Sequence, residues 1–353
     1  MMKTISVNAS KSYNILIGAG ILDEAGSLIR KTTGGQLAAV VADDNVAALY
    51  GERLSDTLMQ NGYRVARYVF PHGESSKNAG TFLSVLNFLA EASFSRTDVV
   101  IALGGGVAGD IAGFAASCYM RGINFVQIPA TLLAMVDSSV GGKTAINLAA
   151  GKNLAGAFYQ PNLVICDTAL LSTLPPEVYR DGCAEIIKYG VLADRALFES
   201  LETLIDGQYE NIIARCVEIK RDIVTEDECE NGVRKLLNFG HTVGHAIELL
   251  SGYAVSHGHA VAAGMAVVTR AAVRMGICEP RCLQELIPML RRYELPENTP
   301  YKADELARAC LSDKKRDGGS ITMVFPAEIG RCVLRGVPVG ELEPVIRSGL
   351  EEL

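Results

Sequence analysis

The chain has 353 residues, of which 49% are hydrophobic and 21% charged, and its formal net charge at pH 7 is −7. This apolar content can fill sizeable cores and excludes an intrinsically disordered chain. The acidic balance and the lack of a basic block argue against a nucleic-acid-binding protein, because phosphate contacts need clustered Lys and Arg. A chain of this length is typical of about two domains.

The N-terminal residues 1–20 alternate apolar and polar side chains and lack the continuous apolar core of a signal peptide. No uninterrupted apolar run in the sequence is long enough to span a bilayer. The nine cysteines are scattered and form no Cys-x-x-Cys pair, which is typical of buried thiols in a reducing compartment. We therefore expect a soluble, globular protein of the cytoplasm.

Short runs rich in β-branched residues alternate with helical patterns through the first half of the chain. The predicted strands cover residues 36–45, 64–70, 97–106, 124–131 and 162–167. Helical patterns lie between them, for example at residues 45–62 and 78–94. This alternation indicates parallel βαβ units and hence a Rossmann-like α/β domain with an open parallel sheet.

The pattern changes near Leu171. Beyond it almost every segment has helical periodicity, and only residues 321–326 and 331–338 resemble short strands. The Pro175-Pro176 pair lies just after the change. We therefore predict an α/β domain over residues 1–170, followed by an all-helical domain over residues 171–353.

A glycine-rich turn follows the predicted strand that ends at Leu103. Gly104, Gly106 and Gly109 match the Gly-x-Gly-x-x-Gly pattern between a strand and a helix, where bare backbone lets a pyrophosphate approach the helix N-terminus. The acidic residue expected about 20 positions later is missing, so an ordinary two-half Rossmann domain is not indicated. Asp43, after an earlier strand, could bind the ribose hydroxyls instead. A purely structural glycine turn is the alternative.

Arg121, Lys143, Lys152 and Asn153 lie among small and apolar residues. Charged side chains in such surroundings are costly to bury without partners. A phosphate or carboxylate of a ligand would supply the partner. The region therefore predicts an anion-binding site, and a solvated loop is the alternative.

Four of the five histidines lie between positions 241 and 259. His241 and His245 are four residues apart in an apolar pattern, so a helix would place both on one face. His257 opens a second apolar stretch. Imidazoles grouped in this way indicate a metal site, because neutral imidazole is the commonest metal ligand. The alternative is a group of buried or surface histidines with structural partners only.

Two further features point to the same region. Glu185 lies in an apolar helical pattern and is the natural carboxylate ligand, since catalytic zinc often takes two histidines, one carboxylate and an open position. Arg234, Asn238, His241 and His245 are spaced by four, three and four residues. This spacing predicts one helical face that carries a cation, an amide and two imidazoles.

Several segments together resemble the 3-dehydroquinate synthase family across essentially the whole chain. They are PHGESSK (71–77), GGGVAGD (104–110), IPATLLAMVDSSVGGKTAIN (128–147), GKNLAGAFYQP (151–161), AEIIKYG (184–190), RKLLNFGHTVGHAIE (234–248), HGHAVAAGM (257–265) and SDKK (312–315). The resemblance implies an N-terminal NAD-binding α/β domain, a helical C-terminal domain and a homodimer. It also implies a divalent metal, normally zinc and otherwise cobalt.

Matched motif by motif, the resemblance implies that Glu185, His241 and His257 are the metal ligands, which leaves His245 for substrate binding and proton transfer. Arg121 matches an arginine that reaches the neighbouring subunit's site. The other implied catalytic and substrate-binding residues are Lys143, Lys188, Asn238, Lys152, Asn153, Lys220, Arg234 and either Lys314 or Lys315. The implied cofactor contacts are Asp43, Asn45, Glu74, Lys77, Gly105, Gly106, Val107, Gly109, Asp110, Ala130, Thr131, Asp137, Ser138, Lys143, Lys152, Leu170 and Thr173.

Two departures from the family pattern are visible. His259 stands where the family usually has Glu, and Ala130 replaces the first residue of a usual Thr-Thr pair. Spacing of two residues from His257 on a helix points His259 to another side. Neither position is an implied metal ligand, so the departures affect only details of the predicted site.

The activity implied is conversion of 3-deoxy-D-arabino-heptulosonate 7-phosphate to 3-dehydroquinate and phosphate. It is a carbon–oxygen lyase reaction of the shikimate pathway, which leads to chorismate and the aromatic amino acids, and it proceeds by transient NAD-dependent oxidation, phosphate elimination, re-reduction and aldol closure. The alternatives are another sugar-phosphate cyclase, such as a 2-deoxy-scyllo-inosose synthase, a metal-dependent polyol dehydrogenase, or a non-catalytic NAD-binding protein.

Overall fold

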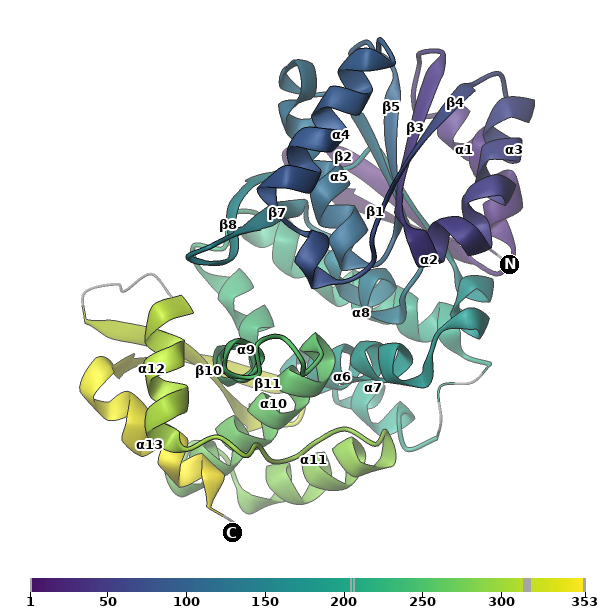
Figure 1. Ribbon diagram of the computed structural model, residues 1–353. Coiled ribbons are helices and arrows are strands. Elements are labelled where there is room, and N and C mark those ends of the chain that lie inside the picture. The colour runs from purple at the N-terminus through teal and green to yellow at the C-terminus, as the bar shows by residue number, and fades with distance from the viewer. Residues whose placement is uncertain (1, 204, 206, 314–318, 352–353) are drawn as a thin grey trace. The chain divides into compact units, whose positions relative to one another are not determined.

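The computed structural model describes residues 2–203, 205, 207–313 and 319–351. The chain divides into two compact units (Figure 1). Unit 1 comprises Met1–Leu174 and Tyr209–Cys229, and unit 2 comprises Pro175–Gln208 and Glu230–Leu353. The predicted boundary near residue 170 lies close to the first crossing between units. The segment Tyr209–Cys229, however, returns to unit 1.

Unit 1 is built on a seven-stranded sheet with the order β1-β2-β9-β6-β5-β3-β4. Its strands are β1 (Lys3–Asn8), β2 (Ser12–Gly18), β3 (Leu37–Asp43), β4 (Arg64–Phe70), β5 (Val99–Gly104), β6 (Asn124–Pro129) and β9 (Leu163–Asp167). β1 and β2 pair antiparallel, and every other pairing in this sheet is parallel. The predicted strands of the first half are therefore confirmed as β3, β4, β5, β6 and β9.

Helices and one hairpin complete unit 1. They are η1 (Ile21–Glu24), α1 (Ala25–Arg30), α2 (Asp44–Val46), η2 (Ala47–Gly51), α3 (Glu52–Gln60), η3 (Glu74–Ser76), α4 (Ala79–Glu91), α5 (Gly106–Cys118), η4 (Tyr119–Arg121), η5 (Ala134–Ser138), the hairpin β7 (Lys143–Leu148) and β8 (Gly151–Phe158), η6 (Thr168–Thr173) and α8 (Tyr209–Glu226). The core lies between α5 and the central strands, where Ile111 and Ala115 pack with Val41, Val100 and Phe125. Each parallel strand buried on both faces reads as a continuous apolar run, as β5 does.

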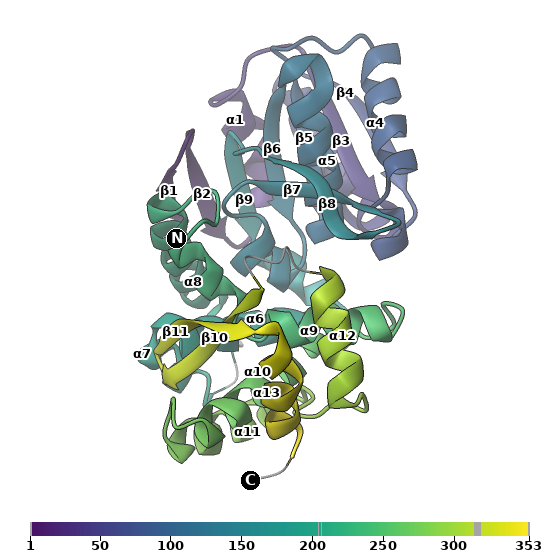
Figure 2. The same ribbon diagram turned by 90° about the vertical axis from the view of Figure 1, so that its left-hand side faces the viewer.

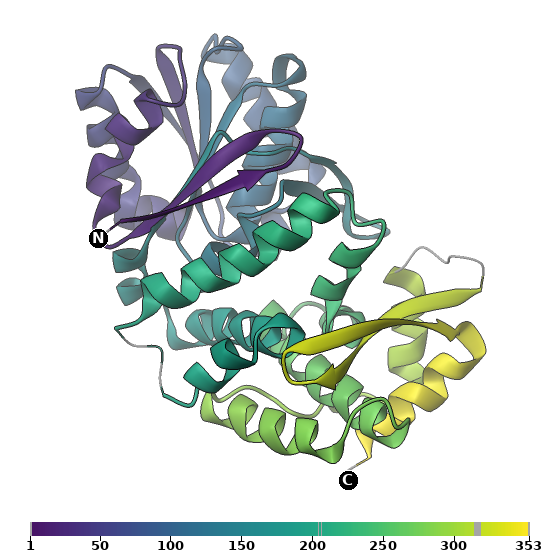
Figure 3. The same cartoon turned by 180° about the vertical axis from the view of Figure 1, so that it is seen from behind.

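Helix α8 belongs to unit 1 because of contacts that are distant in sequence. It packs against β1, β2 and η5, and Figures 2 and 3 show it running beside the β1–β2 hairpin. Thr168 Oγ1 donates a hydrogen bond of 2.6 Å to Glu210, and the Ser10 backbone N–H donates one of 2.7 Å to Glu228. The sequence-based domain assignment put this helix in the second domain, because helical periodicity alone does not reveal the surface on which a helix packs.

Unit 2 is mostly helical. Its elements are α6 (Pro176–Ala193), α7 (Arg195–Ser200), η7 (Val233–Asn238), α9 (His241–Leu250), α10 (His257–Arg274), α11 (Pro280–Arg292), α12 (Ala303–Asp313), β10 (Ser320–Glu328), β11 (Arg331–Pro338), η8 (Val339–Glu341) and α13 (Leu342–Leu350). α10 is central and packs against α6, α9, α11 and α13. β10 and β11 form an antiparallel hairpin. The expectation of an all-helical domain was wrong in this respect, although the two short strands had been identified in the sequence.

Among the described residues, no helix is both long enough and apolar enough to cross a membrane. All nine cysteines are free thiols, and Cys118 and Cys229 are the exposed ones.

Candidate active site

Glycines let three helices of unit 2 approach one another closely. A Cβ on Gly264 of α10 would lie 2.1 Å from the carbonyl oxygen of Gly240, which precedes α9. A Cβ on Gly258 would lie 2.3 Å from Cα of Asp181 on α6. Real Cβ atoms do not approach backbone this closely, so any larger residue would push the helices apart. The start of α9 is therefore held against the middle of α10, and the start of α10 against the N-terminal half of α6.

Glu185, His241 and His257 converge where these helices meet. One donor atom from each lies within 4.8 Å of the others. His241 Nε2 lies 3.6 Å and His257 Nε2 3.4 Å from Glu185 Oε1, and Glu185 is fully buried. Two imidazoles and a carboxylate form a donor set that suits a catalytic divalent ion such as Zn²⁺, which often takes three protein ligands and keeps an open position. The donor chemistry thus fits the metal implied by the sequence.

The two histidines of this set have opposite pKa shifts in the metal-free protein. Burial, assisted by the charge of Lys188, lowers the pKa of His241 well below its ordinary value. Burial alone would also lower the pKa of His257, but hydrogen bonds to Glu185 and Glu248 outweigh it and raise that pKa to about 10. A bound cation would take the place of the His257 proton between the ring and Glu185.

His245 lies beside the donor set. Its ring centroid is 5.5 Å from that of His241 and 5.9 Å from that of His257. A second group of possible ligand atoms contains His245, Glu248 and His257. His257 is common to both groups, so the histidine cluster contains two overlapping donor sets.

Buried cations accompany these groups. Lys188 Nζ lies 2.5 Å from Glu185 Oε2, and both side chains are almost fully buried. Arg234 is fully buried as well. Asn238 Nδ2 donates a hydrogen bond of 2.7 Å to Glu230 Oε1. Unit 2 therefore brings Lys188 close to the ligand carboxylate, as expected for residues of one site.

The predicted single helical face through Arg234 and His245 is not continuous. η7 ends at Asn238, Gly240 has a left-handed φ of 78°, and α9 begins only at His241. A Cβ at Gly240 would lie 2.5 Å from the Met265 side chain, so glycine is required here by space as well as by φ. The prediction was wrong because residue spacing does not reveal the two-residue break at Phe239 and Gly240.

His259, one of the two departures from the family pattern, lies apart from the donor set. His259 Nδ1 is 2.8 Å from Asp181 Oδ1 and 2.8 Å from Ser256 Oγ, and it belongs to neither group of possible ligands. This confirms that it points to another side of α10. Lys314 and Lys315 lie outside the described residues.

Glu248 was not assigned a role from the sequence. Its Oε2 lies 3.2 Å from His257 Nδ1, and its side chain is buried. The available signal was its position on α9, three residues after His245 and seven after His241, which places all three on one helical face.

The glycine-rich turn in unit 1 joins β5 to α5. Gly105 precedes the helix without a side-chain cap, which leaves backbone N–H groups at the N-terminus for an anion. A Cβ on Gly105 would lie 3.2 Å from Thr131 Cγ2, and one on Gly106 would lie 3.2 Å from Ser138 Oγ. Asp43 Oδ2 lies 3.3 Å from the corresponding position on Gly104. Predicted cofactor residues from several segments thus gather around this turn.

The remaining predicted cofactor residues of unit 1 differ in their burial and in their contacts. The Ala130 N–H donates a hydrogen bond of 2.8 Å to the Gly104 carbonyl. Val107 is half-buried and Asn45 is exposed. A Cβ on Gly109 would lie 2.8 Å from Gln127 Oε1, so this glycine is needed for packing against β6. Leu170 and Thr173 both bond to the Tyr50 hydroxyl, at 3.4 and 2.6 Å.

A second polar group in unit 1 surrounds buried Lys77. Its ammonium pairs with Asp110 and donates a hydrogen bond of 2.5 Å to Asn153 Oδ1. Burial raises the pKa of Asp110 in spite of this pairing. Glu74 accepts a hydrogen bond of 2.8 Å from Asn147 and lies 3.6 Å from Lys152 Nζ.

The other predicted cations of unit 1 differ in their exposure and in their contacts. Lys220 of α8 donates hydrogen bonds of 2.8 Å to both the carbonyl and the carboxylate of Asp137. Lys143 is exposed at the start of β7. Arg121 is exposed at the end of η4 and has a φ of 64°.

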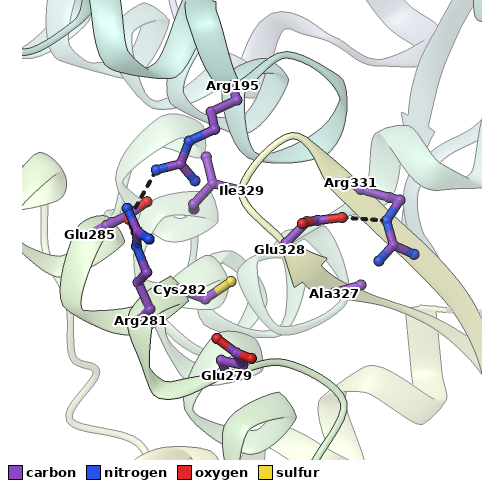
Figure 4. A pocket seen from close by; sticks show the side chains of 9 residues that line it. All are labelled: Arg195, Glu279, Arg281, Cys282, Glu285, Ala327, Glu328, Ile329 and Arg331. Carbon is purple, nitrogen blue, oxygen red and sulfur yellow. Dashed lines mark hydrogen bonds and ion pairs between the residues drawn. The ribbon is translucent and has the colours of Figure 1, made fainter.

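A separate hollow of about 320 Å³ in unit 2 is lined by charged residues of α7, α11 and the β10–β11 hairpin (Figure 4). Arg195 bonds to Glu285 at 3.0 Å and Arg331 to Glu328 at 2.7 Å. The cations are thus neutralised by neighbouring carboxylates. No predicted site residue lines this hollow, so it is not the site of the predicted chemistry.

Comparison with known proteins identifies the family. The family model of the 3-dehydroquinate synthase N-terminal domain matches residues 67–181, and that of the C-terminal domain matches residues 182–316. A 3-dehydroquinate synthase from Vibrio atlanticus is 44% identical over 349 residues, covering 96% of each chain.

Two solved structures are also similar. A 2-deoxy-scyllo-inosose synthase complexed with carbaglucose-6-phosphate, NAD⁺ and Co²⁺ has a TM-score of 0.88 at 27% identity, covering 99% of this chain and 100% of its own. A 2-epi-5-epi-valiolone synthase from Streptomyces hygroscopicus subsp. jinggangensis, with NAD⁺ and Zn²⁺ bound, has a TM-score of 0.88 at 28% identity and 98% coverage of each chain. The sequence relatives, together with both family matches, establish that this chain belongs to the 3-dehydroquinate synthase family.

Proposed function

We propose that the protein catalyses the conversion of 3-deoxy-D-arabino-heptulosonate 7-phosphate to 3-dehydroquinate and phosphate in the shikimate pathway. The observation that carries this proposal is the convergence of Glu185, His241 and His257 into one donor set in a chain of this family. The close structural relatives hold NAD⁺ with Co²⁺ or Zn²⁺. These cofactors agree with the donor set and with the glycine-rich turn.

When bound, NAD⁺ supplies a reversible hydride acceptor and the divalent ion a Lewis acid. Glu185, His241 and His257 would hold the ion. In unit 1, the N–H groups at the start of α5 would bind the pyrophosphate, and Asp43 beside Gly104 would accept hydrogen bonds from ribose hydroxyls. The net reaction leaves no redox change, so NAD⁺ is needed only in catalytic amounts.

The substrate carries a phosphate and a carboxylate, and the chain offers cations for both. We assign these contacts to Lys143, Lys152, Asn153, Lys188, Lys220, Arg234, Asn238 and Lys314. Several already have internal partners, as Lys220 has in Asp137 and Lys188 in Glu185. These pairings offset the cost of burying the cations, and a substrate anion would join or exchange with the carboxylate.

His245 is the group that we assign to proton transfer. Its imidazole is half-buried, close to the donor set, and outside the Glu185–His241–His257 group. An imidazole can accept and return a proton near neutral pH. A proton taken from the substrate at this position could be returned later in the same turnover.

We also propose that the protein acts in the cytoplasm as a homodimer in which Arg121 completes the partner's site. Its nine free thiols agree with a reducing compartment. Met120, Arg121 and Gly122 all have positive φ, and Arg96 bonds to the Met120 carbonyl at 2.9 Å. This bonded turn presents the exposed Arg121 in a defined direction, as a contact to a partner requires.

The direct test supplies the heptulosonate phosphate, zinc and NAD⁺ and follows both phosphate release and formation of the cyclic product. We expect both products in equal amounts. A sugar phosphate without the carboxylate should react far more slowly, because it would lose the contacts that we assign to Lys220 and Arg234. Preference for that sugar phosphate would instead indicate another cyclase of the same fold.

A further inference from the structure

His257 lies between two carboxylates. Its Nε2 is 3.4 Å from Glu185 Oε1, and its Nδ1 is 3.2 Å from Glu248 Oε2. Glu185 is 0% exposed and Glu248 2% exposed. Because a buried carboxylate is costly, its placement against a ring nitrogen needs a physical reason.

His241 shows the same arrangement with a different acceptor. Its Nδ1 lies 3.1 Å from the carbonyl oxygen of Phe239, and its Nε2 faces Glu185. Both rings thus have an oxygen acceptor on the Nδ1 side and direct Nε2 at the same carboxylate oxygen. The acceptors are a backbone carbonyl for one ring and Glu248 for the other.

A neutral imidazole has one N–H and one lone pair, so an acceptor at Nδ1 determines which nitrogen can bind a cation. Glu248 as a carboxylate only accepts hydrogen bonds and therefore keeps the proton on Nδ1. The lone pair is then on Nε2, directed at Glu185 and His241. This geometry favours a role in which Glu248 holds the metal ligand His257 in place, and it disfavours Glu248 as a metal ligand.

We propose that Glu248 is a positioning residue for the metal site: it fixes the tautomer and the orientation of His257 and so raises the affinity for the divalent ion. The proposal rests on the ligand set proposed above. Carboxylates that hold a metal-binding histidine in this way typically change metal affinity by about 10–100-fold. The helix supports the role, since Glu248 lies on α9 beside both His241 and His245.

The test is zinc affinity, measured by competition with a chromophoric chelator on the full chain without substrate or NAD⁺. We expect Glu248→Ala to bind one zinc per chain about 10–100-fold more weakly than the unaltered protein. Glu248→Gln keeps a neutral acceptor and should fall between the two. With cobalt in place of zinc, the visible absorption of both variants should retain the coordination number of the unaltered protein.

Ser251→Ala is the matched control. Its hydroxyl donates a hydrogen bond of 2.9 Å to the Glu248 backbone carbonyl, so its loss disturbs the same helix end and leaves the carboxylate in place. We expect zinc affinity close to that of the unaltered protein.

Unchanged zinc affinity in both Glu248 variants overturns the proposal, and unchanged affinity in Glu248→Gln does so if Glu248→Ala does not fold. A loss of one cobalt ligand in either variant also overturns it and makes Glu248 a direct ligand. If the unaltered protein binds no zinc, the ligand set itself is wrong. If the unaltered protein binds zinc and the Glu248 variants bind it equally well, the proposed role of Glu248 is wrong and the ligand set is unaffected.

Discussion

The metal-ligand cluster of unit 2 and the glycine-rich turn of unit 1 are built in different ways. In the proposed metal site of unit 2, side chains would supply the chemistry, and neighbouring oxygens orient the histidines, as the Phe239 carbonyl does for His241. In unit 1, backbone N–H groups at the start of α5 supply it, and side chains such as Asp43 surround the turn. A side-chain site depends on residue identity, whereas a backbone site depends on the absence of side chains at Gly105 and Gly106.

This contrast predicts that a substitution in unit 2 lowers metal binding without changing NAD⁺ affinity, and that a substitution at the turn of unit 1 does the reverse. The largest effect is expected from His257→Ala, which removes one of the proposed metal ligands. Metal content should fall from about one per chain to well below that, because a structural or catalytic site of three protein ligands loses most of its affinity with one of them. The rate of phosphate release should fall by about 10²–10⁴-fold, which corresponds to several kcal/mol of lost Lewis-acid stabilisation.

The measurement is metal analysis after dialysis, together with phosphate release. NAD⁺ affinity serves as the control for unit 1 and should remain. Stoichiometric metal in His257→Ala would show that the ligand assignment is wrong.

The second effect concerns Arg121, which we place in the site of the partner subunit. Arg121→Ala should cost about 2–5 kcal/mol of transition-state binding, by analogy with truncated charge pairs at interfaces. A guanidinium offers a bidentate fork to phosphate, so Lys would be a poor substitute.

Mixing inactive Arg121→Ala and Lys143→Ala chains tests this directly. A heterodimer would hold one site with neither defect and one site with both, so partial activity should return. Heterodimers that form without regaining activity would place Arg121 in its own subunit's site.

A smaller effect is expected from Gly105→Ala in the backbone site. The added Cβ would lie 3.2 Å from Thr131 Cγ2, closer than ordinary van der Waals contact, and would obstruct the approach of the pyrophosphate. We expect the dissociation constant for NAD⁺ to rise about tenfold, which corresponds to about 1.4 kcal/mol. Isothermal titration measures this, and metal content should stay close to one per chain. Unchanged NAD⁺ affinity would move the pyrophosphate away from this turn.

The smallest effect is expected from His259→Ala. The imidazole bonds to Asp181 and Ser256 and lies outside both groups of possible ligands. Its removal should lower the free energy of unfolding by about 1 kcal/mol, the value of a typical hydrogen bond. Zinc affinity should remain unchanged, and a large loss would make His259 part of the metal site.

Both sites could be predicted in outline from the sequence, for different physical reasons. The α/β pattern predicted β3, β4, β5, β6 and β9, because parallel buried strands are continuous apolar runs. The metal-ligand cluster could be anticipated from Glu185 and the histidine spacing, since these residue types have few other reasons to occur together. The turn after β5 could be anticipated because its glycines stand between a strand and a helix.

What the sequence did not predict depends on contacts between distant segments. The pairing of α8 with the β1–β2 hairpin is decided by surfaces that periodicity does not identify. The break at Gly240 follows from its close contact with Met265, and the contact between Glu248 and His257 depends on the way α9 and α10 pack. The partner of Lys220 was missed for the same reason, because Asp137 is 83 positions away.

We propose that the donor set of unit 2 and the glycine-rich turn of unit 1 serve one redox-neutral reaction, and turnover with trace NAD⁺ tests this proposal. The protein is incubated with zinc, excess heptulosonate phosphate and NAD⁺ at a small fraction of the substrate concentration, and phosphate is measured together with absorbance at the NADH wavelength. We predict many phosphates released per NAD⁺ with no net rise in NADH absorbance. Phosphate release limited to the amount of NAD⁺, with matching NADH accumulation, would contradict the account and indicate a dehydrogenase.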